Sequence, residues 1–438
     1  MAKSIILKSQ MTQQTQSKIR VLFIDHSIAF GGALKSLSLL LHSASFPKAV
    51  EPLVITAQDQ NVIDAWLQGV PYIWYRRILD YRKKERFGSF VQRVISLPWC
   101  SEFLRKCFAL LESFETAYAF CFILWIAWWH KAEIIHANSG FYAESRFAAL
   151  LLRVPWVVHC RGFFAYWDRS TRDNLRGADL VIGVSHAVSQ SVEAQGFPQN
   201  KIATIYDPVE VSSIRDAVTM RLPIRKELGI QDDQIAVAIF GRIVEWKGQR
   251  EFVQAILNVM DYSPQVLGVI VGDEADDSEK QYFSGIKQAI AKSEHRNRFI
   301  LTGYRRDVEA LYAAIDVFVH FSVEPEPFGM VVAEAMAAGK AVIAADDGGP
   351  KEMISHGKDG LLVKTGNVSG LRDAIGTLVN DSRLREALGR AAAEKICSWL
   401  DVEMVARRTA ELYPLLLDVG ARGFEDWQEK SGTGKVGN

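Results

Sequence analysis

The sequence predicts an α/β protein with two doubly wound parallel-sheet domains, and three observations support this prediction. The chain has 438 residues, which is more than one hydrophobic core usually serves. Short β-branched runs alternate with amphipathic helical stretches, the pattern of repeated strand–helix units. The alternation stops in a polar, irregular stretch at residues 207–223 and then starts again. We therefore expect two domains of about 200 residues each.

The first expected domain covers residues 19–210 and follows a polar lead-in at residues 1–18. The longest apolar run of the lead-in has three residues, too few for a signal-peptide core, so export by that route is not expected. A helix is expected to begin at Gly32. The expected strands of this domain are residues 21–25, 52–56, 133–138, 156–160, 180–184 and 201–206.

The second expected domain covers residues 211–400. A last helical stretch at residues 384–417, with a break near Trp399, is long enough to pack on both domains. We assign residues 401–438 to a C-terminal helix that packs back on the N-terminal domain and to a loose tail. The expected strands of the second domain are residues 235–240, 267–272, 298–303, 317–321, 340–345 and 360–363.

The charge balance and the cysteine content limit which binding partners and which cellular compartment can be expected. Lys and Arg together number 51, as do Asp and Glu, so no overall field favours nucleic acid as a partner. The five cysteines show no C-x-x-C spacing and lie in apolar surroundings, where a reduced, buried thiol is the usual state. We expect a cytoplasmic protein without a nucleic-acid partner.

One segment raises the question of a membrane contact. Thirteen consecutive apolar residues occupy positions 117–129, fewer than the ~20 that a membrane span needs. A buried helix is expected here, and a helix that lies in one face of a bilayer is the open alternative. Upstream, residues 75–93 carry seven basic and two acidic side chains among aromatic ones, which fits anionic headgroups or an ordinary solvated face. A peripheral membrane contact through residues 75–131 is therefore one hypothesis.

In open α/β sheets ligands bind beyond the carboxyl ends of the strands, so the loops there are inspected first. The loop after the first strand holds Gly31 and Gly32 ahead of a helix, where exposed backbone N–H groups can approach an anion. The spacing is neither the dinucleotide nor the P-loop fingerprint. Plain loop geometry explains these glycines as well.

The loop at the start of the second domain brings two cations together. Arg242 follows the strand by two residues and Lys247 lies five further on. A guanidinium and an ammonium held close together repel unless an anion lies between them, and a diphosphate satisfies both. Two solvated surface charges are the alternative reading.

The stretch EPEPFGMVVAEAM at residues 324–336 places acids around a stiff turn and a short helix. The helix is expected to start near Gly329, so its free N–H groups form another cradle for phosphate oxygens. Glu326 in the turn can accept hydrogen bonds from sugar hydroxyls, and Glu334 inside the helix can reach a ribose diol. An otherwise apolar helix predicts that Glu334 is buried and has a partner. Glu324 is expected to be solvated.

At this point the sequence resembles the retaining glycosyltransferases of the GT-B fold, in particular the large family 4 group. The donor-site signature of that family is similar to residues 324–363, and four further segments occur in the matching order. The resemblance covers roughly residues 20–417. The further segments are FGRIVEWKGQREFVQAI, LTGYRRDVEALYAAIDVFVHFS, ADLVIGVSHAV and KIATIYDPV.

The resemblance implies two Rossmann-like domains that face a central cleft. It implies transfer of a sugar from a nucleoside-diphosphate sugar to the hydroxyl of a saccharide or lipid-linked acceptor, with the anomeric configuration kept and no metal or other cofactor. Polysaccharide, lipopolysaccharide or glycolipid synthesis is the expected setting. An epimerase or hydrolase on the same fold, and a sugar-nucleotide-binding scaffold with a degenerate site, are the alternatives.

The resemblance also assigns residues to roles. Glu326 is implied to contact the donor sugar and Glu334 the ribose, while Arg242 and Lys247 bind the leaving diphosphate. Residues implied to complete donor binding are Gly31, Gly32, Gly241, Phe328, Gly329 and Met330 around the phosphates, Gly303, Tyr304 and Arg305 near the base, and Glu352 near the pocket.

The chain departs from the family pattern in two places. Arg161 stands where many members have a sugar-contacting histidine, and His159 is the nearest histidine, so either residue is a candidate for that role. The usual Asn-Gly after the sixth strand is replaced by Asp207 and Pro208. On the acceptor side, His136 and Asn138 are candidates at a strand end, and buried packing explains them as well.

Overall fold

The computed structural model describes residues 18–25, 31–75, 98–140, 142–163, 169–274 and 277–418. Within these ranges the side chains of residues 98–109, 111, 112 and 169–171 are not described. Most of the predicted lead-in, the basic and aromatic run at 75–93 and the expected tail lie outside the described residues.

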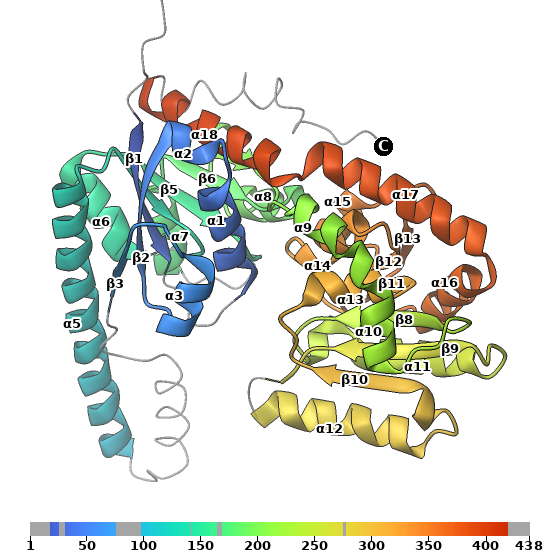
Figure 1. The fold of residues 1–438 in the computed structure, drawn as a ribbon. Helices are drawn as coiled ribbons and strands as arrows, with labels where there is room; N and C mark the ends of the chain where they lie inside the picture. Colours follow the sequence, from blue (N-terminus) through green and yellow to red (C-terminus); the bar gives the residue numbers. More distant parts are fainter. Residues whose placement is uncertain are drawn as a thin grey trace, which may run out of the picture. The chain divides into compact units, whose positions relative to one another are not determined.

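The chain is an α/β protein with two parallel sheets (Figure 1). The first sheet has seven strands in the order β3-β2-β1-β4-β5-β6-β7, and the second has six in the order β10-β9-β8-β11-β12-β13. Both orders place the first strand of the sheet next to the fourth, as in doubly wound folds. The predicted fold class is therefore confirmed.

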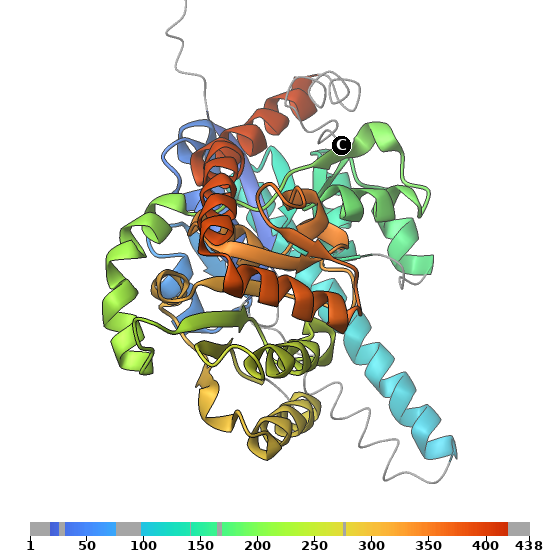
Figure 2. The same ribbon diagram turned by 90° about the vertical axis from the view of Figure 1, so that its right-hand side faces the viewer.

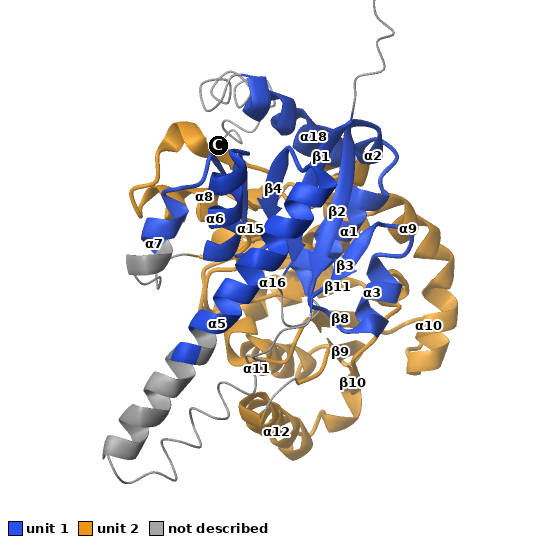
Figure 3. Cartoon of the chain, turned by 90° about the vertical axis from the view of Figure 1, so that its left-hand side faces the viewer, with its two compact units in different colours: residues 1–159, 168–181, 406–425 blue, residues 160–167, 182–405, 426–438 orange. Residues whose placement is uncertain are grey.

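The chain divides into two compact units (Figure 3). Unit 1 comprises residues 1–159, 168–181 and 406–425, and unit 2 comprises residues 160–167, 182–405 and 426–438.

The elements of the first half follow the predicted alternation of strands and helices. The strands are β1 Ile19–Asp25, β2 Val50–Thr56, β3 Tyr72–Trp74, β4 Ile134–Ala137, β5 Trp156–Cys160, β6 Leu180–Gly183 and β7 Ile202–Thr204. The helices are α1 Gly32–His42, α2 Phe46–Ala49, α3 Gln60–Trp66, α5 Pro98–His130, α6 Ala143–Leu152, α7 Arg169–Leu175, α8 His186–Glu193 and the 3₁₀ turn η2 Gln199–Lys201.

The second half repeats the alternation. Its strands are β8 Ile235–Phe240, β9 Val266–Val271, β10 Phe299–Gly303, β11 Val317–His320, β12 Ala341–Ala345 and β13 Leu361–Val363. Its helices are α9 Val211–Asp216, α10 Arg221–Leu228, α11 Gln249–Met260, α12 Asp277–Lys292, α13 Val308–Ala314, α14 Met330–Ala337, α15 Gly348–Met353, α16 Val368–Asn380, α17 Ser382–Trp399 and α18 Val402–Asp418, with 3₁₀ turns η3 Ala217–Met220, η4 Glu245–Lys247 and η5 Arg296–Arg298.

The core of unit 2 is the apolar layer between its central strands and the covering helices. Val237 and Val317 of the sheet lie in one buried cluster with Phe252 of α11 and Ile375 of α16. The near-continuous apolar strands follow from this arrangement, because a parallel sheet is covered on both faces. The cluster packs β8 and β11 against α11 and α16.

The apolar stretch at 117–129 lies in the long helix α5, Pro98–His130. Figures 1 and 2 show α5 as one continuous helix. Ala119, Ile123 and Ile126 are buried, whereas Trp125 and Trp128 are exposed. The expectation of a buried helix is therefore right for one face only. No helix among the described residues is long and apolar enough to cross a membrane.

The thiols also differ from the expectation. Cys160 is buried as predicted, but Cys121 is exposed on α5 and Cys397 is half-buried. All three are free thiols. Cys121 lies in an apolar stretch of sequence, yet its turn of α5 faces outward, so burial could not be inferred from the neighbouring residue types alone.

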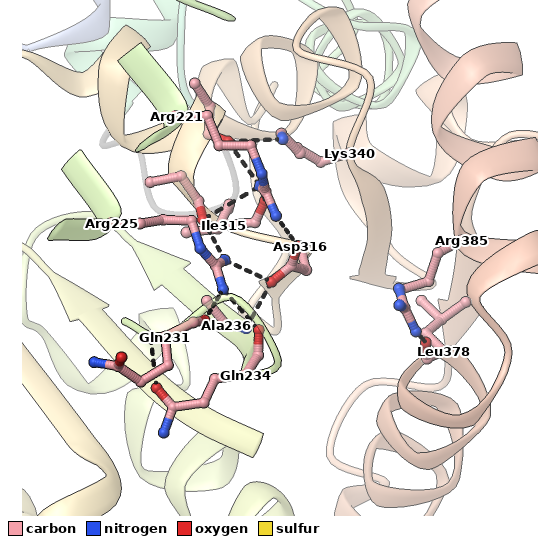
Figure 4. Close-up of polar contacts among 12 residues, drawn as sticks. Arg221, Arg225, Gln231, Gln234, Ala236, Ile315, Asp316, Lys340, Leu378 and Arg385 are labelled. Atoms are coloured by element: carbon pink, nitrogen blue, oxygen red, sulfur yellow. Dashed lines mark hydrogen bonds and ion pairs between the residues drawn. The ribbon is translucent and has the colours of Figure 1, made fainter. Parts of the chain in front are cut away.

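A network of arginines fastens the amino-terminal end of the second sheet (Figure 4). Arg225 of α10 donates to Asp316 at 3.1 Å and to the carbonyl oxygen of Ala314 at 3.0 Å. Arg221 donates to the same carboxylate at 2.6 Å. Burial, together with the charge of Arg221, lowers the pKa of Lys340 to about 8. This network joins α10 to the end of α13 and the start of β11.

Candidate active site

The candidate site lies at the carboxyl ends of β8 and β11 in unit 2. These two strands are neighbours, and the strand order reverses between them. At such a switch point the loops from adjacent strands diverge, which leaves room for a ligand. The loop after β8 carries the predicted Arg242 and Lys247, and the turn after β11 carries the predicted Glu326.

Backbone contacts clamp the loop after β8 against its neighbours. The N–H of Val323 donates to the carbonyl oxygen of Trp246 at 2.8 Å, and the N–H of Ile243 donates to that of Asp273 at 3.0 Å. Gly248 has a φ of 75°, and a Cβ at this position would collide with the carbonyl oxygen of Phe321. Only glycine permits this close approach, so Gly248 allows the loop after β8 to pack directly against the backbone that follows β11.

Lys247 and Glu326 form an ion pair at this junction. Both side chains are mostly buried. Nε2 of His320, at the end of β11, lies 3.2 Å from Oε2 of Glu326, and Oγ of Ser322 lies 3.3 Å from the same ring nitrogen. The Lys247 ammonium also lies 4.1 Å from the ring centroid of Trp246. Two of the predicted catalytic residues are thus in direct contact.

The surroundings of Glu326 keep it ionised. Burial opposes the charged form, but the charge of Lys247 and the hydrogen bond from His320 outweigh burial and lower the pKa of Glu326 to about 2. A carboxylate held in this state is an acceptor at every physiological pH and cannot act as a proton donor.

The predicted cation Arg242 pairs with an acid that the sequence did not single out. Nε of Arg242 lies 3.1 Å from Oε1 of Glu279 on α12. The Arg242 side chain is 55% exposed, whereas Glu279 is buried. Each of the two predicted cations is therefore held by a carboxylate, and the convergence of both cations on a diphosphate stays a prediction.

Helix α14 begins directly after the turn, as predicted. Gly329 has a φ of 90° and precedes Met330, the first residue of the helix, and no side chain of the described residues caps this N-terminus. The free N–H groups of the first turn are therefore available to an anion. Phe328, which precedes the glycine, is buried and packs beside Tyr206.

Glu334 has the partner that its burial predicted. It is buried in α14 and accepts a hydrogen bond of 3.0 Å from the phenol of Tyr312 on α13. The same phenol lies 3.1 Å from the carbonyl oxygen of Val331. Burial, with the charge of Glu334, raises the pKa of Tyr312 well above its usual range. The proposed contact with a ribose stays a prediction.

The glycines ahead of Glu352 pack α15 against the same turn. The N–H of Gly349 donates to the carbonyl oxygen of Glu326 at 2.8 Å. Gly348 has a φ of 58°, and a Cβ there would collide with that carbonyl group. The turn that carries Glu326 is consequently held from both sides, by the Lys247 loop and by α15.

Glu352 contacts the start of α8. Its carboxylate accepts hydrogen bonds from the N–H groups of His186 and Ala187 at 2.8 and 2.7 Å. The phenol of Tyr206 donates to it at 2.8 Å. Negative charge at a helix N-terminus is favourable, so these contacts fix α8 to α15. A role in the donor pocket stays a prediction.

The expected base-binding turn lies at the end of β10. Gly303 has a φ of 68°, and the Tyr304 ring is exposed. Arg305 is engaged by Asp307 and Glu227, and these hydrogen bonds raise the pKa of Arg305 above its usual range. Gly241, whose φ is 142°, follows β8 and donates its N–H to the carbonyl oxygen of Val271 in the adjacent strand.

Arg161 and Asp207, the residues at which the chain departs from the family pattern, contact each other in the structure. Arg161 forms a buried ion pair with Asp207, which replaces the usual asparagine. His159 is buried at the end of β5 in unit 1. A catalytic role for Arg161 stays a prediction, and its carboxylate partner indicates that its charge is already balanced.

In unit 1 the candidates lie at the switch point between β1 and β4. Asn138 donates to Asp25 and to the carbonyl oxygen of Ala33, both at 3.2 Å. His136 is buried, and its Nδ1 lies 2.9 Å from the Tyr413 hydroxyl of α18. This supports the packing explanation for His136. Gly31 and Gly32 stand at the N-cap and the first position of α1, as expected.

Sequence reasoning missed His320, Glu279 and Tyr312. His320 is a lone polar residue at the carboxyl end of the apolar strand VFVHF, a position where a buried ligand-facing group is common. Glu279 and Tyr312 gave no such signal, because each lies among ordinary helical residues and acts through a partner distant in sequence. Among the described residues, no group of three His, Cys, Asp or Glu side chains is placed to hold a metal ion.

The sequence also matches known families and proteins. Residues 220–395 match the family Glycosyl transferases group 1, and residues 80–208 match the Glycosyl transferase 4-like domain. D-inositol 3-phosphate glycosyltransferase of Corynebacterium jeikeium (strain K411) is 30% identical over 300 residues, which cover 62% of this chain and 70% of that protein. Spore coat protein SA of Bacillus subtilis (strain 168) is 28% identical over 243 residues, which cover 53% of this chain and 64% of that protein. The chain spans less than two thirds of the length of Spore coat protein SA and of two further curated relatives, namely 64%, 62% and 61%.

Solved structures share the fold over most of the chain. Anabaena Alr3699/HepE in complex with UDP-glucose is 25% identical with a TM-score of 0.70, and the match covers 90% of this chain and 99% of that one. A glycosyltransferase from Rickettsia africae ESF-5 is 18% identical with a TM-score of 0.76, covering 92% of this chain and 100% of that one. The chain therefore has the GT-B fold and belongs to the group 1 glycosyltransferases.

Proposed function

We propose that this chain is a retaining glycosyltransferase that moves a sugar from a nucleoside-diphosphate sugar to an acceptor hydroxyl. The observation that carries the proposal is the Lys247–Glu326 pair at the switch point of the second sheet. A buried cation and an ionised acid side by side suit a ligand that presents phosphate to one and hydroxyls to the other.

The proposed reaction breaks one bond, forms one bond and moves one proton, and the groups of the candidate site stabilise the leaving diphosphate. The bond from the anomeric carbon to the diphosphate breaks, and its electron pair stays on the diphosphate. The acceptor oxygen bonds to the same face of that carbon, and the acceptor proton passes to an oxygen of the leaving phosphate. Lys247, Arg242 and the N–H groups at the start of α14 oppose the developing negative charge without a metal ion or other cofactor.

The donor base is proposed by analogy with two relatives. Alr3699/HepE has been solved with UDP and with UDP-glucose, which makes a UDP-sugar the first donor to test. A relative from Mycobacterium tuberculosis (strain CDC 1551 / Oshkosh), 33% identical over 225 residues, is a GDP-mannose-dependent alpha-mannosyltransferase, which makes GDP-mannose the second. Polysaccharide, lipopolysaccharide or glycolipid synthesis, with a saccharide or lipid-linked acceptor at the cytoplasmic face of a membrane, remains the proposed setting.

An epimerase or hydrolase on the same fold is the alternative function. It predicts a free or isomerised sugar from the nucleotide sugar alone, whereas the glycosyltransferase predicts turnover that rises with added acceptor. Product analysis with and without acceptor separates the two.

Substitution of Glu326 tests the assigned chemistry. Glu326→Gln should lower transfer at least about a hundredfold, the scale seen when one preorganised group is lost from such a site. The matched control is Glu324→Gln, because Glu324 lies in the same turn but is exposed. Anomer analysis of the product by NMR checks retention. Full activity of the Glu326 variant, or an inverted product, would contradict the proposal.

A further inference from the structure

The outer face of α5 is mostly apolar among its described side chains, with Ser113 and Thr116 as the exposed polar residues. Exposed side chains recur at spacings of three, four and seven residues, which places them on one side of the helix. The buried side chains Ala119, Ile123 and Ile126 lie on the opposite side. The exposed stripe consists of Leu110, Phe114, Tyr118, Cys121, Trp125, Trp128 and Trp129.

Helix α6 widens this stripe into a two-helix surface, which we call the α5–α6 face. The two helices pack against each other on the side of unit 1 that Figure 3 presents. Phe147, Leu150 and Leu151 of α6 are all exposed, with Leu150 at 70%. Ten exposed apolar side chains on two helices that pack together are unusual on a monomer and mark an interaction site.

Some of these apolar residues lie at the end of the sheet where the strands begin. Helix α5 leads into β4 and α6 leads into β5, and these strands pair in parallel, so both helices end at the amino-terminal end of the strands. Trp128 and Trp129 at the end of α5 are 67% and 62% exposed. They therefore lie at the same end of the sheet as Leu150 and Leu151.

Two cations lie at this end of the sheet in an unusual backbone conformation. Residues 116–129 carry no charge, and Lys131 and Arg153 follow the two helices directly. Both are exposed, with φ values of 52° and 56°. Glycine normally occupies this left-handed position after a helix, because a Cβ is disfavoured there. Lys131 and Arg153 both adopt this disfavoured conformation, and both carry a positive charge.

We propose that the α5–α6 face lies in the interfacial layer of an anionic phospholipid bilayer. Lys131 and Arg153 complement the negative headgroups, and the apolar side chains enter the acyl boundary. The three indole N–H groups favour this occupant over a second copy of the chain. At a bilayer interface headgroups and water accept their hydrogen bonds, whereas a dry helix seam would leave the donors unpaired. This inference does not depend on the proposed transfer chemistry.

Vesicle binding by the full chain tests the inference. We expect the wild type to sediment with vesicles of phosphatidylcholine and phosphatidylglycerol, and much less with phosphatidylcholine alone. The triple substitution Trp125→Ser, Trp128→Ser and Trp129→Ser should weaken binding at least tenfold. Replacing Lys131 and Arg153 by Gln should weaken binding to the anionic vesicles by a similar factor. The matched control carries Val218→Ser, Met220→Ser and Leu222→Ser, which remove exposed apolar side chains in unit 2, and it should bind as the wild type does.

A second measurement needs no variant. Brominated acyl chains should quench tryptophan fluorescence of the wild type in anionic vesicles, because the exposed indoles of α5 would lie near the acyl boundary. Absence of wild-type binding or quenching, or equal binding by the tryptophan triple, would overturn the inference. A wild-type dimer in light scattering that the tryptophan triple converts to a monomer would assign the face to a second copy instead. Nucleotide-sugar stabilisation, which reports on unit 2, is measured in parallel so that failure of the transfer proposal is seen separately.

Discussion

Glu326 is ionised in a mostly buried position because Lys247 and His320 both contact its carboxylate. The carboxylate is thus ready to accept hydrogen bonds from sugar hydroxyls, while Lys247 has donors left over for a phosphate. His320 is a positioning residue in this account. It touches the acid, and it fixes where the carboxylate points before any ligand arrives.

The lowered pKa of Glu326 predicts a defined pH dependence of stability. Its pKa is about 2 in the folded chain and ordinarily about 4.5, so its contribution is complete above pH 4.5 and is lost as the pH falls toward 2. The unfolding free energy of the wild type relative to Glu326→Gln should fall by about 1 kcal/mol between about pH 6 and about pH 3.5. Urea denaturation at both pH values measures this difference. A difference that is constant or grows in acid would show that the pKa is not lowered.

Glu279 is predicted to position Arg242 for the donor diphosphate. Without the carboxylate the exposed guanidinium must be ordered during binding, which costs about 1 kcal/mol for a long side chain, or roughly fivefold in affinity. Glu279→Ala should therefore raise the donor KM by that factor while kcat changes less. The control is Asp277→Ala in the same first turn of α12, where the side chain is 93% exposed. An unchanged donor KM would remove this role from Glu279.

At the residue scale, the sequence located the strand-end acids and cations but not what holds them. Lys247, Glu326 and Gly329 follow strands or begin a helix, so their positions were readable from the periodicity of their neighbours. His320 ends the strand just before the Glu326 turn, whereas Glu279 and Tyr312 lie on helices far in sequence from Arg242 and Glu334, the residues that they contact. Pairings between elements depend on the packed fold, and one sequence does not encode them in a local pattern.

At the element scale, α10 acts as a clamp, because it connects the segments that lead into β8 and β11 of the second sheet. The guanidinium of Arg225 is buried, and it binds Asp316 and the carbonyl oxygens of Ala314, Gln231 and Gln234 (Figure 4). Asp316 also accepts a hydrogen bond from the N–H of Ala236 at 2.8 Å. The start of β8 and the start of β11 are therefore joined through one arginine.

This clamp predicts a large loss of stability on truncation. Arg225→Ala leaves a carboxylate and several carbonyl groups without their donor in a mostly buried position, so the unfolding free energy should fall by about 3 kcal/mol. Lys226→Ala on the same helix, where the side chain is exposed, should change it by less than about 0.5 kcal/mol. Chemical denaturation of the two variants beside the wild type provides the comparison. Equal stability of both variants would show that the network contributes little.

The expected strands were all found, and β3 was missed. The strand β3 has three residues, Tyr72–Trp74, at the edge of its sheet, and two of its side chains are exposed. Its apolar run, YIWY at residues 72–75, is too short to show a strand period. For α5 the composition alone could not choose between a buried and an exposed helix, because both of its faces are apolar and only packing tells them apart.

At the scale of the whole molecule, the repeated strand–helix alternation was enough to predict two parallel sheets. Each sheet reverses its strand order at a switch point, and the candidate residues of each unit lie there, at Asn138 in the first and at Lys247 and Glu326 in the second. The acceptor could not be predicted, because residues 58–131, the part of the first domain that we expect to bind it, show no motif that names a ligand.

The most direct test of the central claim is the thermal stability of the chain with UDP-, GDP- and ADP-sugars in the presence of a metal chelator. A ligand at a hundredfold its Kd stabilises the folded state by about 2.7 kcal/mol. We predict that one nucleotide sugar raises the melting temperature of the wild type and that Lys247→Ala removes most of this shift. The Glu324→Gln control should keep it. No shift with any donor, or a shift that Lys247→Ala leaves intact, would contradict the account.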